Sequence, residues 1–372
     1  MPPAALRLLP GSSLQFGPPR RTASWAQIRR DKHIVWRQLA PERVDFCPPP
    51  FTCNDRSNPL ADGRRIVWPE TGVADIPGAR LLDENAWVVG PGDRFLADFC
   101  YVGPSRHSRG YHLTTLNEPR RLPGTTLNLC SAHSAHNFFH FAIDAIARAE
   151  LVERAGFTWE DFDHIVLPRL KSRMTDEILA NLGVPAGKVV HLKWRDHVWC
   201  DRLIQPSFPG PLACTPRWVF EFYRRWFPVV SGERGRRLYF PRRGDRHPSN
   251  ESEIAAMLKS RGVEAVDPLT TPNLRELLAT ASHVVGVHGA GLANLVFCAP
   301  GTRVLELMPS DIAAHYNRWF YYSLCHSGDL PYGVVIGKSQ RRRLTSFSPQ
   351  SPGPFEIPLD DLERGLEALL RP

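Results

Sequence analysis

Residues 284–307 read VVGVHGAGLANLVFCAPGTRVLEL, in which two apolar runs flank the turn His288-Gly289-Ala290-Gly291. The run before the turn has the pattern of a buried strand, and the run after it resumes as a helix. In doubly wound α/β folds, a strand passes into a helix through such a turn at the carboxyl edge of the sheet. The stretch therefore predicts a buried parallel strand whose glycine turn lies at that edge.

Strand-like and helix-like segments alternate around this stretch, from residue 232 to residue 340. Asn250 and Glu253 have the spacing of a helix capping box, and Thr271-Pro272 has that of an N-cap followed by proline. This βαβα order predicts a parallel sheet covered by helices. We therefore expect residues 232–340 to form a Rossmann-like domain.

The rest of the chain divides by composition. Residues 1–60 are rich in Pro, Arg and Ser, which predicts an irregular N-terminal lead-in. Residues 61–231 carry short strand-like runs and a helix pattern from His136 to Gly156, which predicts a first α/β domain. Residues 341–372 have the pattern of a linker and a C-terminal helix, with packing back on the first domain as one option.

The bulk composition excludes two classes of protein. The 372 residues include 42% hydrophobic and 23% charged residues, so the chain can bury a core and is not a disordered polymer. No apolar run reaches the roughly 18 residues of a membrane-spanning helix, and the N-terminus lacks the apolar core of a secretion signal. We expect a cytoplasmic protein, with attachment to the inner face of the membrane as an alternative.

The formal net charge of +8 and the pI near 9.2 raise the question of a nucleic-acid partner. The excess is small for this length, and its one dense run, Arg341–Arg343, sits in a Ser- and Pro-rich stretch typical of a solvated loop. We therefore expect no nucleic-acid partner. The eight cysteines lie far apart without the spacing of a zinc site, which favours free, buried thiols.

The glycine turn has the residues of an anion site. Its two glycines leave main-chain N–H groups open at a helix start, where phosphate binds readily, and His288 adds a donor. The preceding strand RRLYFPRR ends in Arg242 and Arg243, and guanidinium groups bind phosphate oxygens in bidentate fashion. Glu306 either accepts hydrogen bonds from a ribose or forms a salt bridge at a strand end. The alternative for the glycines is close packing alone.

A second candidate site lies in HNFFHFAIDAIARAE, residues 136–150. His136, His140 and Asp144 recur every four residues, so we expect them along one stripe of a helix. A histidine one turn from a carboxylate is a workable general-base pair, and either His140 or Asp144 can take the proton. Asn137 either caps the helix or contacts a ligand. The structural alternative pairs Asp144 with an arginine and leaves His140 in a polar notch.

Three motifs occur in this order along the chain: N-F-F-H-F-x-x-D, a strand ending in R-R followed by N-E, and H-G-A-G-L-x-N-L-x-F-x-x-P-G-x-x-V-L-E-L. This combination resembles glycosyltransferase family 61, and in particular its bacterial members of the capsular polysaccharide type. The resemblance spans roughly residues 80–340, and its C-terminal motif is the more specific. The chain departs from the family at Phe141, where tryptophan is frequent.

The resemblance implies a GT-B fold, which is α/β with two Rossmann-like domains facing across a cleft. It implies an inverting glycosyltransferase that moves a sugar from a nucleotide-diphosphate donor, a UDP-sugar, to a glycan acceptor, as in capsule or other cell-surface polysaccharide synthesis. Residues 61–231 would be the acceptor-side domain and residues 232–340 the nucleotide-sugar-binding domain. The implied catalytic residues are Asp144 and His140, with Asn137 on the acceptor side. The implied donor-binding residues are Arg242, Arg243, His288, Gly289, Ala290, Gly291, Leu292 and Glu306.

Two other classes of enzyme, the α/β hydrolases and the dinucleotide-dependent oxidoreductases, fit the sequence less well. The G-x-S-x-G motif of an α/β hydrolase is absent, and Gly286, Gly289 and Gly291 do not form the G-x-G-x-x-G of a dinucleotide-dependent oxidoreductase. A non-catalytic glycan- or nucleotide-binding relative stays open. The sequence identifies no cofactor, and a divalent cation (Mn²⁺ or Mg²⁺) also stays open. The only Asp-x-Asp, Asp161-Phe162-Asp163, precedes a strand, and we interpret it as a helix-to-strand turn.

Overall fold

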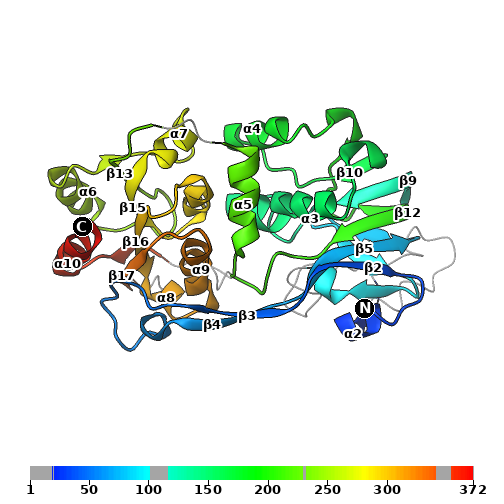
Figure 1. Cartoon of the computed structure of the whole chain (residues 1–372), viewed down its shortest axis with the longest axis horizontal. Helices are drawn as coiled ribbons and strands as arrows, with labels where there is room; N and C mark the ends of the chain where they lie inside the picture. The colour runs from blue at the N-terminus through cyan, green and yellow to red at the C-terminus, as the bar shows by residue number, and fades with distance from the viewer. Residues whose placement is uncertain (1–18, 20, 101–115, 229–231, 341–352, 372) are drawn as a thin grey trace. The chain divides into compact units, whose positions relative to one another are not determined.

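The computed structural model describes residues 19, 21–100, 116–228, 232–340 and 353–371. The chain divides into two compact units (Figure 1). The first comprises the described residues of Met1–Arg43 and Pro69–Leu212, and the second those of Val44–Trp68 and Ala213–Pro372. Both units mix helices with strands, which confirms the α/β class.

The first unit is built on a ten-stranded sheet. Its strands are β1 (Arg21–Ala23), β2 (Val35–Ala40), β5 (Thr71–Pro77), β6 (Arg80–Leu82), β7 (Trp87–Gly90), β8 (Arg94–Leu96), β9 (Arg120–Asn128), β10 (His164–Val166), β11 (Val189–Val190) and β12 (His197–Pro206). Strands β12, β9, β10 and β11 run parallel, but β12 also pairs antiparallel with β5 and β6. The sheet is therefore mixed, and it departs from the parallel sheet implied for a Rossmann-like first domain.

The helices of the first unit are short. They are α2 (Trp25–Ile28), η2 (Ala97–Phe99), η4 (His140–Ala145), η5 (Ile146–Arg148), α3 (Ala149–Arg154), η6 (Trp159–Asp161), α4 (Arg173–Asn181) and η7 (Ala186–Lys188). The single helix expected from His136 begins at Phe138 and passes through a π-helix (η4) and a 3₁₀ turn (η5) before α3. It ends as predicted at Gly156, which takes the left-handed conformation (φ +85°) that favours glycine.

The second unit carries a six-stranded sheet in the order β14-β13-β15-β16-β17-β18. Its strands are β13 (Arg236–Phe240), β14 (Glu264–Ala265), β15 (Ala281–Val287), β16 (Arg303–Pro309), β17 (Tyr332–Ser339) and β18 (Phe355–Glu356). Strands β13 to β17 run parallel, which confirms the sheet predicted from the sequence. Strand order reverses between β13 and β15, and the carboxyl ends of strands at such a switch point are where doubly wound sheets bind ligands.

The helices of the second unit follow the predicted alternation with local differences. They are η1 (Pro59–Asp62), α5 (Arg217–Trp226), α6 (Glu251–Ser260), α7 (Leu274–Ala279), η8 (Ala290–Phe297), α8 (Ser310–Ala313), η9 (Tyr316–Arg318), α9 (Trp319–Ser327) and α10 (Leu359–Leu370). Asn250 precedes α6 as predicted, but its side chain bonds the backbone of Ile357 and makes no capping box. The N-cap of α7 is Asn273, not Thr271.

The C-terminal helix α10 belongs to the core of the second unit. It packs against β16, β17 and α6. Leu362, Leu366 and Leu369 lie on its buried side and have no exposed surface. Their spacing is that of an amphipathic helix face, so burial of this face against the sheet holds the helix in place. The helix therefore packs within the second unit.

The lead-in expected over residues 1–60 is ordered over much of its described part. Residues 21–47 form β1, α2, β2 and β3 (Arg43–Cys47), and β3 pairs with β4 (Arg64–Trp68). Beyond β3 the chain lines up beside β17, where Phe51 N donates to Tyr332 O at 2.8 Å. This explains why the segment Val44–Trp68 belongs to the second unit although it is distant in sequence.

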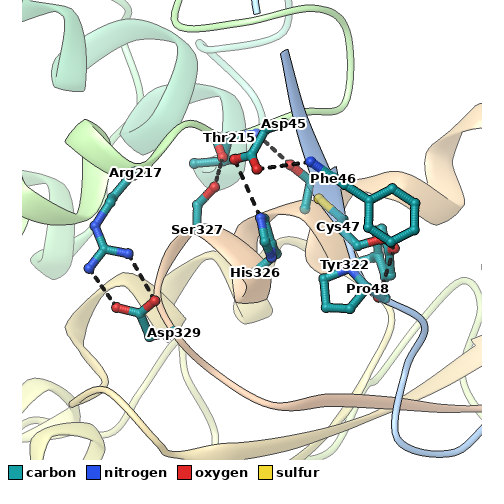
Figure 2. Close-up of polar contacts among 11 residues, drawn as sticks. Asp45, Phe46, Cys47, Pro48, Thr215, Arg217, Tyr322, His326, Ser327 and Asp329 are labelled. Atoms are coloured by element: carbon teal, nitrogen blue, oxygen red, sulfur yellow. Dashed lines mark hydrogen bonds and ion pairs between the residues drawn. The ribbon is translucent and has the colours of Figure 1, made fainter. Parts of the chain in front are cut away.

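Helix α9 connects β3 to the chain before α5 (Figure 2). The Tyr322 hydroxyl donates to Cys47 O at 2.6 Å and to Pro48 O at 2.9 Å. The Ser327 hydroxyl, at the end of the same helix, donates to Thr215 O at 2.5 Å. Because backbone carbonyls of two distant segments are bonded by one helix, α9 fixes both segments to the second unit.

Three other expectations from the sequence concern the cysteines, the basic run and membrane-spanning helices. All eight cysteines are free and buried, as predicted. The basic run Arg341–Arg343 lies outside the described residues. Among the helices of the described ranges, none has the length and apolarity to cross a membrane.

Replacing Tyr322 by Phe tests the anchoring role of α9. The change removes the donor but keeps the ring, so the buried Cys47 carbonyl loses a partner, and we expect the free energy of unfolding to fall by about 1–3 kcal/mol. Urea-induced unfolding at equilibrium measures this. Asp329→Asn, which breaks an exposed ion pair with Arg217, is the control and should cost less. Equal losses in the two variants would contradict the assignment.

Candidate functional site

The glycine turn has bonded carbonyl groups and open amide groups. Arg242 Nη1 donates to His288 O at 3.2 Å, and the Tyr321 hydroxyl donates to Gly289 O at 2.5 Å. In the described part of the chain, the amides of residues 289–291 donate to no protein acceptor. These amides stand at the start of η8, beside the switch point of the sheet. The turn therefore presents main-chain hydrogen-bond donors of the kind that bind anions at a helix start.

Each glycine near the turn makes room for a specific neighbour. A Cβ on Gly289 would lie 1.8 Å from Nη1 of Arg242. A Cβ on Gly291 would lie 2.8 Å from Cγ of Pro268, and one on Gly286 would lie 2.4 Å from Cδ2 of Leu292. Close packing thus explains two of the glycines, whereas Gly289 lets a guanidinium reach the turn. Leu292 itself is fully buried.

The two arginines predicted after β13 differ in their surroundings. Arg242 is half-buried, and its Nε also donates to Asp245 O at 2.7 Å. Burial, followed by the charge of the neighbouring Arg246, lowers the pKa of Arg242 to about 10. Arg243 is exposed. Sequence reasoning missed Arg246, which is half-buried near Arg242 and carries no motif of its own.

His288 is held by a buried carboxylate. Its Nδ1 lies 2.5 Å from Oε1 of Glu306, and the Tyr332 hydroxyl donates to Oε2 of Glu306 at 2.6 Å. Glu306 has no exposed surface. Each of its oxygens bonds a protein side chain, which fits the alternative of a salt bridge at a strand end. The carboxylate orients His288 and leaves Nε2 as the ring atom for a ligand.

His140 and Asp144 form a pair of the same type in the first unit. His140 Nδ1 lies 2.6 Å from Oδ2 of Asp144, and the two side chains are 11% and 6% exposed. Both sit in the π-helix η4, a helix form that is frequent at functional sites. The buried carboxylate again bonds Nδ1, so Nε2 is the basic atom of the pair.

The neighbours predicted beside this pair lie elsewhere. His136 precedes the helix and is exposed, with Nε2 3.4 Å from Oε1 of Glu84, so it does not share the stripe. Asn137 caps the helix, because its Oδ1 accepts from Phe139 N at 2.9 Å. Sequence reasoning missed His133, whose ring centroid lies 5.4 Å from that of His140. Burial lowers the pKa of His133, with further contributions from the neighbouring histidines.

Arg148 supports the same helix from inside the unit. It is fully buried, and its guanidinium donates to Pro206 O at 3.1 Å and to Cys130 O at 2.6 Å. Its guanidinium carbon also lies 4.6 Å from the ring centre of Phe208. Burial lowers the pKa of Arg148 to about 10. The residue joins the ends of β9 and β12 to the segment that carries His140.

The Asp-x-Asp segment is a turn, as interpreted from the sequence. Asp161 Oδ2 accepts from Thr158 N at 2.7 Å, and Asp163 Oδ2 accepts from Thr125 N at 2.8 Å. Both carboxylates therefore bond backbone amides, one just before η6 and the other in β9.

The comparisons with known proteins bear on both sites. Residues 138–305 match the model of the family Glycosyltransferase 61. This range includes His140, Asp144, Arg242 and the glycine turn. The match covers less than half of the chain and shows that this part is similar to that family. No match was found among curated proteins.

Replacing Arg148 by Met tests its supporting role. The side chain keeps its bulk, but two buried carbonyls lose a charged donor, so we expect the free energy of unfolding to fall by roughly 3 kcal/mol. Equilibrium unfolding in urea measures the loss. Arg154→Met, at an exposed position in α3, is the matched control and should change stability little. An Arg148→Met protein as stable as the control would refute the role.

Proposed function

Taking the match to glycosyltransferase family 61 as premise, we propose that the chain is an inverting glycosyltransferase. It transfers a sugar from a nucleotide-diphosphate donor, a UDP-sugar, to a glycan acceptor. The observation that carries the proposal is the glycine turn, whose amides are open while its carbonyls are bonded. Sugar transfer breaks a bond to the diphosphate, and oriented donors stabilise the negative charge that develops there.

The donor side of this reaction uses the second unit. The amides of residues 289–291 and the Arg242 guanidinium bind phosphate oxygens, as charge-assisted donors do. In its protonated form, His288 donates from Nδ1 to Glu306 and from Nε2 to a phosphate oxygen. Glu306 is therefore proposed as a positioning residue for His288, held in turn by the hydroxyl of Tyr332.

The acceptor side uses the first unit, and here we propose His140 as the general base. Its Nδ1 is bonded to Asp144, so Nε2 receives the proton of the acceptor hydroxyl. Asp144 fixes the ring orientation and stabilises the imidazolium that forms. One base on the face opposite the leaving diphosphate is sufficient for inversion, and no covalent intermediate is required.

The proposal includes the GT-B arrangement implied by the resemblance, with the first unit on the acceptor side and the second on the donor side. It also includes a role in capsule or other cell-surface polysaccharide synthesis. A net charge of +8 suits an acidic glycan or peripheral contact with an anionic membrane face. Small-angle scattering with and without UDP tests the arrangement, because closure of a GT-B cleft reduces the radius of gyration.

A non-catalytic relative that binds a nucleotide or a glycan is the second candidate. The open turn alone would serve binding equally well, but a His140–Asp144 pair in a π-helix favours catalysis. Release of UDP from a panel of UDP-sugars, with and without acceptors, separates the two. A catalytic protein turns over at least one donor, and a binding protein turns over none.

Nucleotide binding tests the donor side of the proposal. UDP should raise the melting temperature of the protein in a concentration-dependent manner, because binding to the native state alone stabilises it. NAD at equal concentration should raise it less, since the glycine order is not that of a dinucleotide site. Differential scanning fluorimetry measures both shifts. A larger shift with NAD than with UDP would count against the nucleotide-sugar assignment.

Substitutions at His140 and Asp144 test the acceptor side of the proposal. His140→Ala should lower kcat by about 10²–10⁴-fold, and Asp144→Asn by on the order of a hundredfold, with KM for the donor little changed. His136→Ala, at an exposed position outside the pair, is the control and should leave kcat within about twofold. Steady-state kinetics of sugar transfer measures these values. Unimpaired turnover in His140→Ala would exclude His140 as the base, and unimpaired turnover in Asp144→Asn would exclude the role of Asp144.

A further inference from the structure

We propose that Arg246, and not Arg243, is the second guanidinium of the donor site, and that the site takes a diphosphate in preference to a monophosphate. The inference rests on the proposed function, because it identifies the donor as a nucleoside diphosphate sugar. It starts from the loop after β13, where three arginines occur within five residues, at positions 242, 243 and 246.

Arg246 has the surroundings of a residue that binds an anion. It is half-buried, and it directly follows Asp245, whose backbone carbonyl accepts a hydrogen bond from Nε of Arg242 at 2.7 Å. Over the described ranges, Arg246 forms no hydrogen bond and no ion pair. Arg243 differs because it is exposed to solvent. Between Arg243 and Arg246, Arg246 is thus the one that an anion bound at the turn would pair with.

Two neighbouring guanidinium groups are costly without an anion. Each is partly desolvated, and burial lowers the pKa of both arginines. Within the part of the chain that the structure describes, Arg242 donates only to the backbone carbonyls of His288 and Asp245. The exposed carboxylate of Asp245 attracts both groups but is screened by solvent. Like charges held together in this way persist where a ligand supplies the missing negative charge.

The backbone at Arg246 supports the same conclusion. Its φ of +63° lies in the left-handed region, which a residue with a Cβ rarely adopts. Gly244, two residues earlier, has a φ of +77°. The chain therefore turns over residues 244–246, directly after Arg242 and Arg243. Strained residues that the fold maintains cluster at ligand-binding positions.

The charge and the donors together select the ligand. A nucleoside diphosphate sugar carries one negative charge on each phosphate, which matches two guanidinium groups. A nucleoside monophosphate sugar carries one charge and would leave one guanidinium uncompensated. The three amides of residues 289–291 add donors in a row beside Arg242. A diphosphate has enough oxygens to bond both arginines and this row of amides.

Calorimetric titration with inorganic pyrophosphate and inorganic phosphate tests the inference on the full chain. We expect pyrophosphate to bind the unmodified protein at least about tenfold more tightly than phosphate. Arg246→Gln should weaken pyrophosphate binding about tenfold or more, because a charge-assisted pair is lost. Arg243→Gln is the matched control and should change it less than about twofold. Equal loss in both variants, or equal affinity for the two anions, would overturn the inference.

A stability measurement distinguishes ligand binding by Arg246 from a purely structural role of that residue. Without ligand, Arg246→Gln should melt at the same temperature as the unmodified protein or higher, because a repulsive charge is removed. A lower melting temperature would indicate that Arg246 serves the fold and would overturn the inference. Sugar transfer in the unmodified protein, together with unimpaired pyrophosphate binding in Arg246→Gln, would refute the inference but leave the proposed function standing. Arg246-dependent pyrophosphate binding without transfer from any nucleotide sugar would support the inference and refute the proposed function.

Discussion

The hydrogen bonds of one turn, residues 288–291, set the chemistry of the second unit. Its carbonyls at His288 and Gly289 are bonded by Arg242 and Tyr321, side chains that come from other elements of the same unit. Among the described residues, the amides of residues 289–291 donate to no protein acceptor, so they are available to a ligand. The parallel sheet adds position, since its strand order reverses between β13 and β15, where the turn lies.

A histidine–carboxylate pair occurs in each unit, and we assign the two pairs different roles. In each, a histidine bonds a buried carboxylate through Nδ1, at 2.6 Å in the His140–Asp144 pair and at 2.5 Å in the His288–Glu306 pair. The carboxylate fixes the ring, and Nε2 is left for chemistry. In the proposed reaction, Nε2 of His140 accepts a proton from the acceptor hydroxyl. Nε2 of His288 instead donates to the departing diphosphate, so the pairs differ in the direction of the hydrogen bond.

Local sequence patterns predicted the parts of the fold that local interactions determine. Alternating strands and helices gave the parallel sheet of the second unit, and the i, i+4 spacing placed His140 beside Asp144 although the helix is π and not α. Residues with distant partners escaped prediction. Tyr321 bonds a carbonyl 32 positions away, and Arg148 one 58 positions away. The side chain of Asn250 bonds the backbone of Ile357, which only the folded chain brings near.

The central claim is that the open amides of the glycine turn bind the diphosphate of the donor. A crystal structure of the protein with UDP tests this most directly. The account predicts phosphate oxygens at hydrogen-bond distance, about 3 Å, from the amides of residues 289–291 and from the Arg242 guanidinium. UDP bound at another place, with these amides bonded to protein atoms, would contradict it.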